Sequence, residues 1–212
     1  MLTPQMQDFI PRLKNYFLSR FLGRQYNGDE LEFTANDRRS VIIENNEIYR
    51  HKVLRVNYTT YDLRCGQDSL NPRVAGHSDF MVLSPETEEL NEDPHPYWYG
   101  RILGIFHATV RHVGPLSMSS EPQRMEFLFV RWFGRDMTPR SGWKAKRLLH
   151  LGFVPGKNGM AFGFVDTSQV IRAVHLIPAF AWGLTTEYLT TSHIARPFSE
   201  PTEDWQLYYV GM

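Results

Sequence analysis

Hydrophobic and polar residues alternate through most of this chain, and the longest such stretches are residues 97–111 and 125–133. Both are dense in aromatic and β-branched residues, and both carry glycine or arginine where a helix would favour alanine or leucine. This pattern predicts two long strands. Gly104 comes four positions after Gly100, an even step along a strand, so we expect both glycines on one face. There a missing side chain lets a strand bend or another backbone approach.

Helical spacing is confined to the N-terminal region. Apolar residues recur at three- and four-residue steps over residues 3–23, which predicts a helix. Thr3 is the expected N-cap and Pro4 the first helical residue, while Gly23 ends the pattern. Pro11 falls inside the pattern, so we expect it to kink or divide the helix.

Shorter alternating runs predict the remaining strands. Asn45-Asn46 separates the first two runs and suits a hairpin turn. Residues 155–159 suit a five-residue turn joining two paired strands, and residues 166–169 suit a tight turn or one helical turn. Residues 62–78 predict a loop, and residues 84–96 an acidic, proline-containing loop. The expected short strands are 41–43, 47–49, 52–61, 80–83, 148–154, 160–165, 170–177 and 205–210.

One helix and about eight to ten short strands predict a mainly β (α+β) fold, a small curled sheet or barrel with an N-terminal helix. No internal repeat or low-complexity tract divides the chain. We expect residues 1–27 to form a helical attachment. Residues 28–212 are expected to form a single β-rich domain that carries the acidic loop 84–96.

Composition narrows the function classes. The chain has 23 basic and 23 acidic residues, and this balance argues against non-specific nucleic-acid binding by the whole surface. Cys65 is the only cysteine, so no intramolecular disulfide and no cysteine-rich zinc site can form. No apolar run approaches the ~20 residues of a membrane span, and the N-terminus lacks a signal peptide. We therefore expect an intracellular protein.

The sequence carries no catalytic motif. Its acidic residues cluster in loops, its eight histidines show neither H-x-x-x-H nor H-E-x-x-H spacing, and no nucleophile elbow, P-loop or G-x-G-x-x-G is present. We therefore expect no enzymatic activity, no cofactor and no metal. A nuclease would need acidic residues and a histidine to converge in one cleft, and the candidates for that arrangement are Asp62, Asp79, Asp166 and His175.

Aromatic and basic side chains are the binding candidates. Aromatic rings near a barrel mouth could form a cage for methylated lysine, at about 0.5–2 kcal/mol per cation–π contact, could stack unpaired bases, or could simply fill the core. The stretch from Arg111 to Lys157 contains nine basic and three acidic residues. This stripe could contact phosphates or dock the acidic loop. The candidate residues are Tyr97, Trp98, Tyr99, Trp132, Trp143, Arg135, Arg140, Lys144, Lys146 and Arg147.

Eight motifs are spread over nearly the whole chain. They are RVNYTTYDLR (55–64), QD (67–68), NPR (71–73), HPYWY (95–99), FVRWFGRD (129–136), AFGFVD (161–166), SQVIR (168–172) and HLIPAF (175–180). With these motifs the chain resembles fungal proteins of the Plavaka type, in the CACTA group of cut-and-paste DNA transposons. It also resembles the C-terminal domain of unknown function in plant CACTA proteins and, in outline, bromo-adjacent-homology (BAH) and SH3-like modules.

The resemblance implies an accessory region that follows the transposase core, in a nuclear protein. Relatives carry a catalytic region upstream of the helix and a further tail after residue 210, so transposase activity is not expected here. We expect a non-catalytic module that contacts chromatin, protein or nucleic acid, possessing neither a membrane nor a metal partner. The alternative is a structural or assembly domain for a transposase core supplied in trans.

Overall fold

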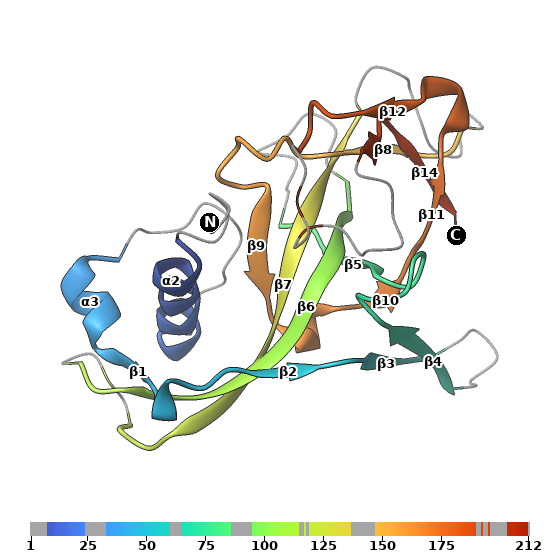
Figure 1. Ribbon diagram of the computed structural model, residues 1–212. Coiled ribbons are helices and arrows are strands. Elements are labelled where there is room, and N and C mark those ends of the chain that lie inside the picture. Colours follow the sequence, from blue (N-terminus) through green and yellow to red (C-terminus); the bar gives the residue numbers. More distant parts are fainter. Residues whose placement is uncertain are drawn as a thin grey trace.

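The computed structural model describes residues 8–23, 33–59, 65–85, 95–114, 117, 119–136, 147–189, 192, 195 and 203–211. These residues form a mainly β fold with a helix near the N-terminus, as the sequence predicts (Figure 1). The sheet is bent, and no ladder closes it into a barrel among the described strands, so the barrel alternative is wrong. The likeness to BAH and SH3-like modules stays a prediction.

Two long antiparallel strands form the centre of the fold and confirm the strongest sequence prediction. They are β6 (Tyr97–His112) and β7 (Gln123–Arg135). Their register shifts between Ile102 and Gly104, because β6 carries one extra residue there. Gly100 pairs with Trp132 and Gly104 with Phe129. Trp132 comes three positions after Phe129 on β7, an odd step, so their side chains lie on opposite faces. The two glycines therefore also lie on opposite faces, contrary to the prediction.

Three shorter strands pair with the outer edge of β6. They are β5 (Asp79–Leu83), β1 (Val41–Ile43) and β2 (Tyr49–His51). The predicted hairpin between β1 and β2 does not form, since both strands pair antiparallel with β6, one after the other. Asn45 and Asn46 both have φ of 55° within the 3₁₀ turn η1 that links the strands. This left-handed pair makes a local loop, after which the chain resumes its direction.

The other edge of β7 is used in the same way. β9 (Phe162–Val165) pairs with Leu128 to Arg131, and β8 (His150–Phe153) pairs with Phe133 to Arg135. The predicted pairing of β8 with β9 is therefore wrong. Trp132 lies between the two ladders, where its backbone N–H donates to Ala161 and its carbonyl accepts from Val154.

The ends of the large sheet come from neighbouring parts of the chain. β8 also pairs with β14 (Tyr208–Gly211), and β14 pairs with β11 (His175–Pro178). At the other end, β10 (Arg172–Ala173) pairs with β5. Val174 alone separates β10 from β11, and its N–H donates to the carbonyl of Asp79. The predicted strand 170–177 is thus split between both ends of the order β10-β5-β6-β7-β8-β14-β11.

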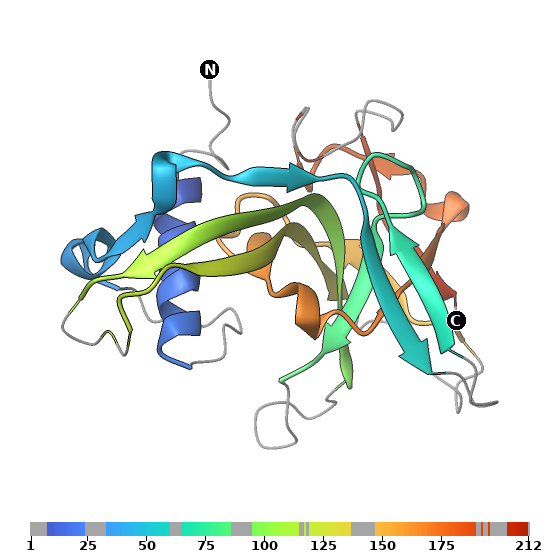
Figure 2. The same cartoon turned by 90° about the horizontal axis from the view of Figure 1, so that it is seen from below.

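Two small sheets and short helical turns complete the described chain. β3 (Leu54–Thr59) and β4 (Cys65–Leu70) form a hairpin that projects at the end of the molecule opposite α2 (Figure 2). β4 corrects the loop expected over residues 62–78; its polar residues lie on a largely exposed strand. The remaining elements are β12 (Leu184–Thr185), β13 (Asp204–Trp205), η3 (Thr167–Gln169) and η4 (Phe180–Trp182).

The N-terminal helix packs against the sheet beside β1 and β9 (Figure 1). Helix α2 (Phe9–Phe21) begins only two residues before Pro11, so the proline lies in the first turn and neither kinks nor divides the helix. Thr3 and Pro4, the predicted start, are outside the described residues. A second helix, α3 (Ala35–Arg39), follows and is capped by Thr34 and Asp37.

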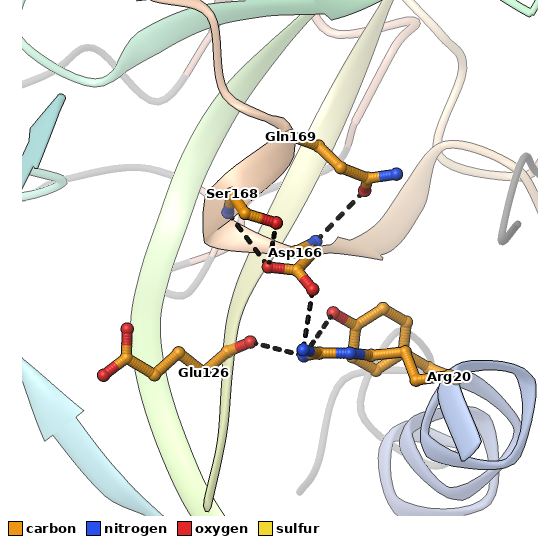
Figure 3. Close-up of polar contacts among 6 residues, drawn as sticks. Arg20, Glu126, Asp166, Ser168 and Gln169 are labelled. Atoms are coloured by element: carbon orange, nitrogen blue, oxygen red, sulfur yellow. Dashed lines mark hydrogen bonds and ion pairs between the residues drawn. The ribbon is translucent and has the colours of Figure 1, made fainter. Parts of the chain in front are cut away.

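A polar cluster ties α2 to the sheet (Figure 3). Arg20 pairs with Asp166 at 2.7 Å and donates to the carbonyl of Glu126 at 2.8 Å and to the hydroxyl of Tyr16 at 3.2 Å. The Asp166 carboxylate also accepts from the backbone N–H and hydroxyl of Ser168. Through the first of these bonds Asp166 caps η3. This confirms the helical turn predicted at 166–169 and gives Asp166 a structural role.

Candidate binding site

Two buried arginine–aspartate pairs lie side by side inside the bent sheet. Arg101 and Arg131 are register partners on β6 and β7. Arg101 binds both carboxylate oxygens of Asp79 at 2.7 and 3.0 Å, and Arg131 binds those of Asp204 at 3.0 and 2.8 Å. The ring of Phe153 lies 5.1 Å from the Arg101 guanidinium and 3.7 Å from that of Arg131. Each charge is thus neutralised internally.

A recess of about 420 Å³ opens at the end of β7 and β8. We call it the aromatic recess. Its floor includes the paired glycines Gly134 and Gly152, which leave room because they carry no side chains. A Cβ on Gly152 would lie 3.1 Å from both the Tyr188 hydroxyl and the Gln206 carbonyl. The side chains that give the recess its chemistry are Arg135, Asp136, Trp182, Tyr188 and Gln206.

Tyr188 is a fixed, neutral donor in the aromatic recess. Its hydroxyl donates to the Gln206 carbonyl at 3.1 Å. Burial raises the pKa of Tyr188, and the carboxylates of Glu187, Asp136 and Asp204 raise it further. The phenol therefore keeps its proton at neutral pH, and its ring presents an immobile aromatic surface.

Trp182 supplies the exposed aromatic surface of the recess. It is 54% exposed, and Phe180 in the same turn η4 is 69% exposed. Phe180 packs edge-on against Trp205 at 5.1 Å. Gly183, with φ of 74°, turns the chain directly after Trp182 and allows η4 to end there. Large aromatic rings left in solvent are typical of contact surfaces.

Four of the five aromatic candidates lie within the described residues, and these four do not form an open cage. Tyr99 is 2% exposed among the side chains inside the sheet, and burial raises its pKa to about 12. Trp98 and Trp132 are half-buried, pack edge-on at 6.0 Å and adjoin the apolar cluster under β5. Tyr97 is half-buried against the cluster that contains Tyr99. These four rings pack into or against the core, one of the outcomes that alternation left open.

Of the basic candidate residues, only Arg135 and Arg147 lie within the described residues. Arg135 lines the aromatic recess, and its charge lowers the pKa of Tyr99 against the larger effect of burial. Arg147 is exposed. The candidates outside the described residues are Trp143, Arg140, Lys144 and Lys146.

Two of the four residues considered for nuclease chemistry form ion pairs with arginines. Asp79 pairs with Arg101, and Asp166 pairs with Arg20. His175 is exposed on β11, and Asp62 is outside the described residues. Within the described ranges, no group of three or more histidine, cysteine, aspartate or glutamate side chains could hold a metal ion.

Sequence reasoning missed the residues that make the recess. Trp182 stands in the short apolar run Phe180-Ala181-Trp182, outside every predicted strand. A tryptophan in a predicted loop has no strand face to fill, and this was the available signal. Tyr188 and Gln206 gave no signal, because they are brought together only by the fold.

No protein-family model, curated protein or solved structure matches the chain. Helices in the described part of the chain are all too short or too polar to cross a membrane.

Proposed function

We propose that this chain is a non-catalytic binding module of a transposon-derived nuclear protein. The transposon origin and the nuclear location are supported by the motif resemblance alone. The binding role is supported by one observation, the aromatic recess with half-exposed Trp182 at its edge. Concave sites that combine aromatic surface with a few placed polar groups are the usual form of binding sites.

The lining of the recess favours a protein segment that carries a long basic side chain. The rings of Trp182 and Tyr188 attract a cation through their faces, and the recess carries one acidic and one basic side chain, Asp136 and Arg135, so the aromatic faces carry the preference. The Nδ1 atom of His150 lies 3.9 Å from the Asp136 carboxylate. Lysine-rich and methylated chromatin tails present this chemistry, so they are the partners we propose.

Nucleic acid is the less favoured ligand. Phosphate binding requires several exposed cations on one face. The chain is neutral overall. Three of its arginines, Arg131, Arg101 and Arg20, form ion pairs with carboxylates of the same chain. In the recess the charge of Arg135 is balanced by Asp136, so no excess of positive charge is left for a phosphate.

The test is a titration of the purified chain, followed by NMR, with four ligands. These are unmodified and methylated histone-tail peptides, single-stranded DNA and double-stranded DNA. We expect saturable peptide binding that Trp182→Ala weakens by about tenfold or more. Leu83→Ala is the matched control, because Leu83 is 70% exposed and does not line the recess. Binding to DNA alone, or peptide binding unchanged by Trp182→Ala, contradicts the proposal.

An assembly domain for a transposase core is the second candidate function. It is favoured by exposed apolar side chains close to the recess in the chain: Ile177, Phe180 and Leu184 are 38%, 69% and 38% exposed. Light scattering with and without the core region separates the two functions. Self-association, or a complex with the core that Phe180→Ser disrupts, would favour assembly; a monomer that binds peptide favours the first function.

A further inference from the structure

Two histidines that are far apart in the sequence meet on the polar face of the sheet. His51 ends β2 and His107 lies within β6. The Nε2 atom of His51 and the Nδ1 atom of His107 are 2.6 Å apart, and the ring centroids are 4.8 Å apart. Both side chains are half-buried, so solvent reaches them.

The strands hold this pair in place. His107 pairs in register with Tyr49, and His51 pairs with Ile105, so the two histidines are diagonal neighbours on adjacent strands. The Tyr49 ring stacks on the His107 ring at 4.9 Å with an interplanar angle of 12°. The Tyr49 hydroxyl is bonded in turn to Glu47. The facing nitrogens are therefore set by backbone pairing and by a stacked ring.

Two imidazole nitrogens that lie this close can both become ligands of one first-row transition-metal ion. Zn–N bonds of about 2.0–2.1 Å in tetrahedral geometry place two ligating nitrogens roughly 3.3 Å apart. Side-chain rotation that opens the present 2.6 Å contact by about 0.7 Å would admit an ion. In the neutral pair one ring donates its N–H to the other. On metal binding that proton moves through solvent to the other nitrogen of the same ring, so both facing nitrogens become ligands.

We propose that His51 and His107 form a binding site for one divalent transition-metal ion of the zinc and nickel class. Water completes the coordination. Imidazole ligands suit these ions, whereas Mg²⁺ and Ca²⁺ prefer sets of oxygen ligands. The site is independent of the aromatic recess, which lies on other strands, so the two proposals stand or fall separately.

The test is calorimetric titration of the untagged full-length chain with ZnCl₂ and, separately, with NiCl₂. We expect one ion per chain. His51→Ala and His107→Ala should each weaken binding by about tenfold or more. His175→Ala is the matched control, because His175 is exposed on β11, away from the pair in sequence and in pairing.

Circular dichroism and thermal unfolding of each variant show whether it folds. His51 ends a short strand, so His51→Ala carries the test if His107→Ala does not fold. MgCl₂ is the negative control. Three results would overturn the site. The first is equal binding by the wild type and both folded histidine variants, and the second is loss of binding in His175→Ala. The third is the absence of saturable Zn²⁺ and Ni²⁺ binding.

Discussion

Arg131 is a fully buried guanidinium, and its energetics depend on Asp204. The pair is bidentate, with both contacts at 3.0 Å or less, and the Phe153 ring covers the guanidinium at 3.7 Å. Removing either partner leaves a charge in a low-dielectric interior, whereas removing both leaves none. The pair therefore matters most when it is broken on one side.

We predict that Arg131→Met lowers the free energy of unfolding by about 3–5 kcal/mol. The double variant Arg131→Met/Asp204→Leu should recover a large part of this loss, because no unpaired charge remains. Urea unfolding measures both values. Arg124→Met is the control, since Arg124 pairs with Glu126 at an exposed site and should change stability by less than about 1 kcal/mol. Equal losses in the single and double variants would rule out the charge argument.

Part of this residue-level picture could have been predicted from the sequence. Arg101 and Arg131 stand inside apolar strands, where a charged side chain needs a partner. The partner of Arg131 could not be predicted, because Asp204 is 73 residues away and lies outside the predicted strands. Spacing along the chain also hid the meeting of His51 with His107. Such pairs depend on strand register, which no local pattern determines.

At the scale of elements, the β3–β4 hairpin stands outside the large sheet. It forms a separate two-stranded sheet and adjoins the large sheet at β10. Asp68 on β4 accepts from the Ala173 backbone N–H at 3.0 Å and from Arg172 at 3.3 Å. The Arg172 guanidinium also lies 3.7 Å from the Tyr58 ring. An isolated hairpin is marginally stable in water, so these contacts stabilise its strands.

We predict that Asp68→Ala speeds amide hydrogen exchange in β3 and β4 by about tenfold, which corresponds to roughly 1.4 kcal/mol of lost local stability. Exchange in the centre of β6 and β7 should not change. Ser69→Ala is the control, because Ser69 is an exposed neighbour on the same strand. Faster exchange throughout the sheet would show that the hairpin is not a separate unit.

At the scale of elements, the sequence located most strands and misassigned how they pair. Strands β6 and β7 were found because their composition is strongly β-forming over many residues. The hairpins expected at Asn45-Asn46 and at residues 155–159 were wrong, because turn-forming residues also occur where one strand is interrupted and then continues. Pro11 misled for a related reason: the helix begins later than its apolar pattern does.

The stability of the whole molecule should depend on pH through His112. This histidine is 4% exposed and stacks on Phe21 of α2 at 5.4 Å, between the helix and the sheet. Burial lowers its pKa below the ordinary value of 6.5. Burial, followed by the charges of Arg124 and His51, lowers the pKa of His107 in the same direction. The unfolded chain therefore binds protons more readily than the folded chain at mildly acidic pH.

We predict that the free energy of unfolding is constant above about pH 7 and falls as the pH is lowered through about 6.5 toward 5. Urea unfolding at several pH values measures this slope. His112→Gln should reduce the slope even if it lowers stability overall, and His175→Gln, at an exposed position, should leave the slope intact. A wild-type curve that is flat across this range would exclude the mechanism.

The arrangement of β10 and β11 has a consequence for how this chain can change. A single residue, Val174, spans the two margins of the large sheet, so extra residues there would let the margins drift apart. The surface turn at residues 156–160 carries no such constraint, because lengthening it leaves the ladders of β8 and β9 untouched. Length variation among natural sequences of this fold should therefore gather at that turn and avoid the span at Val174.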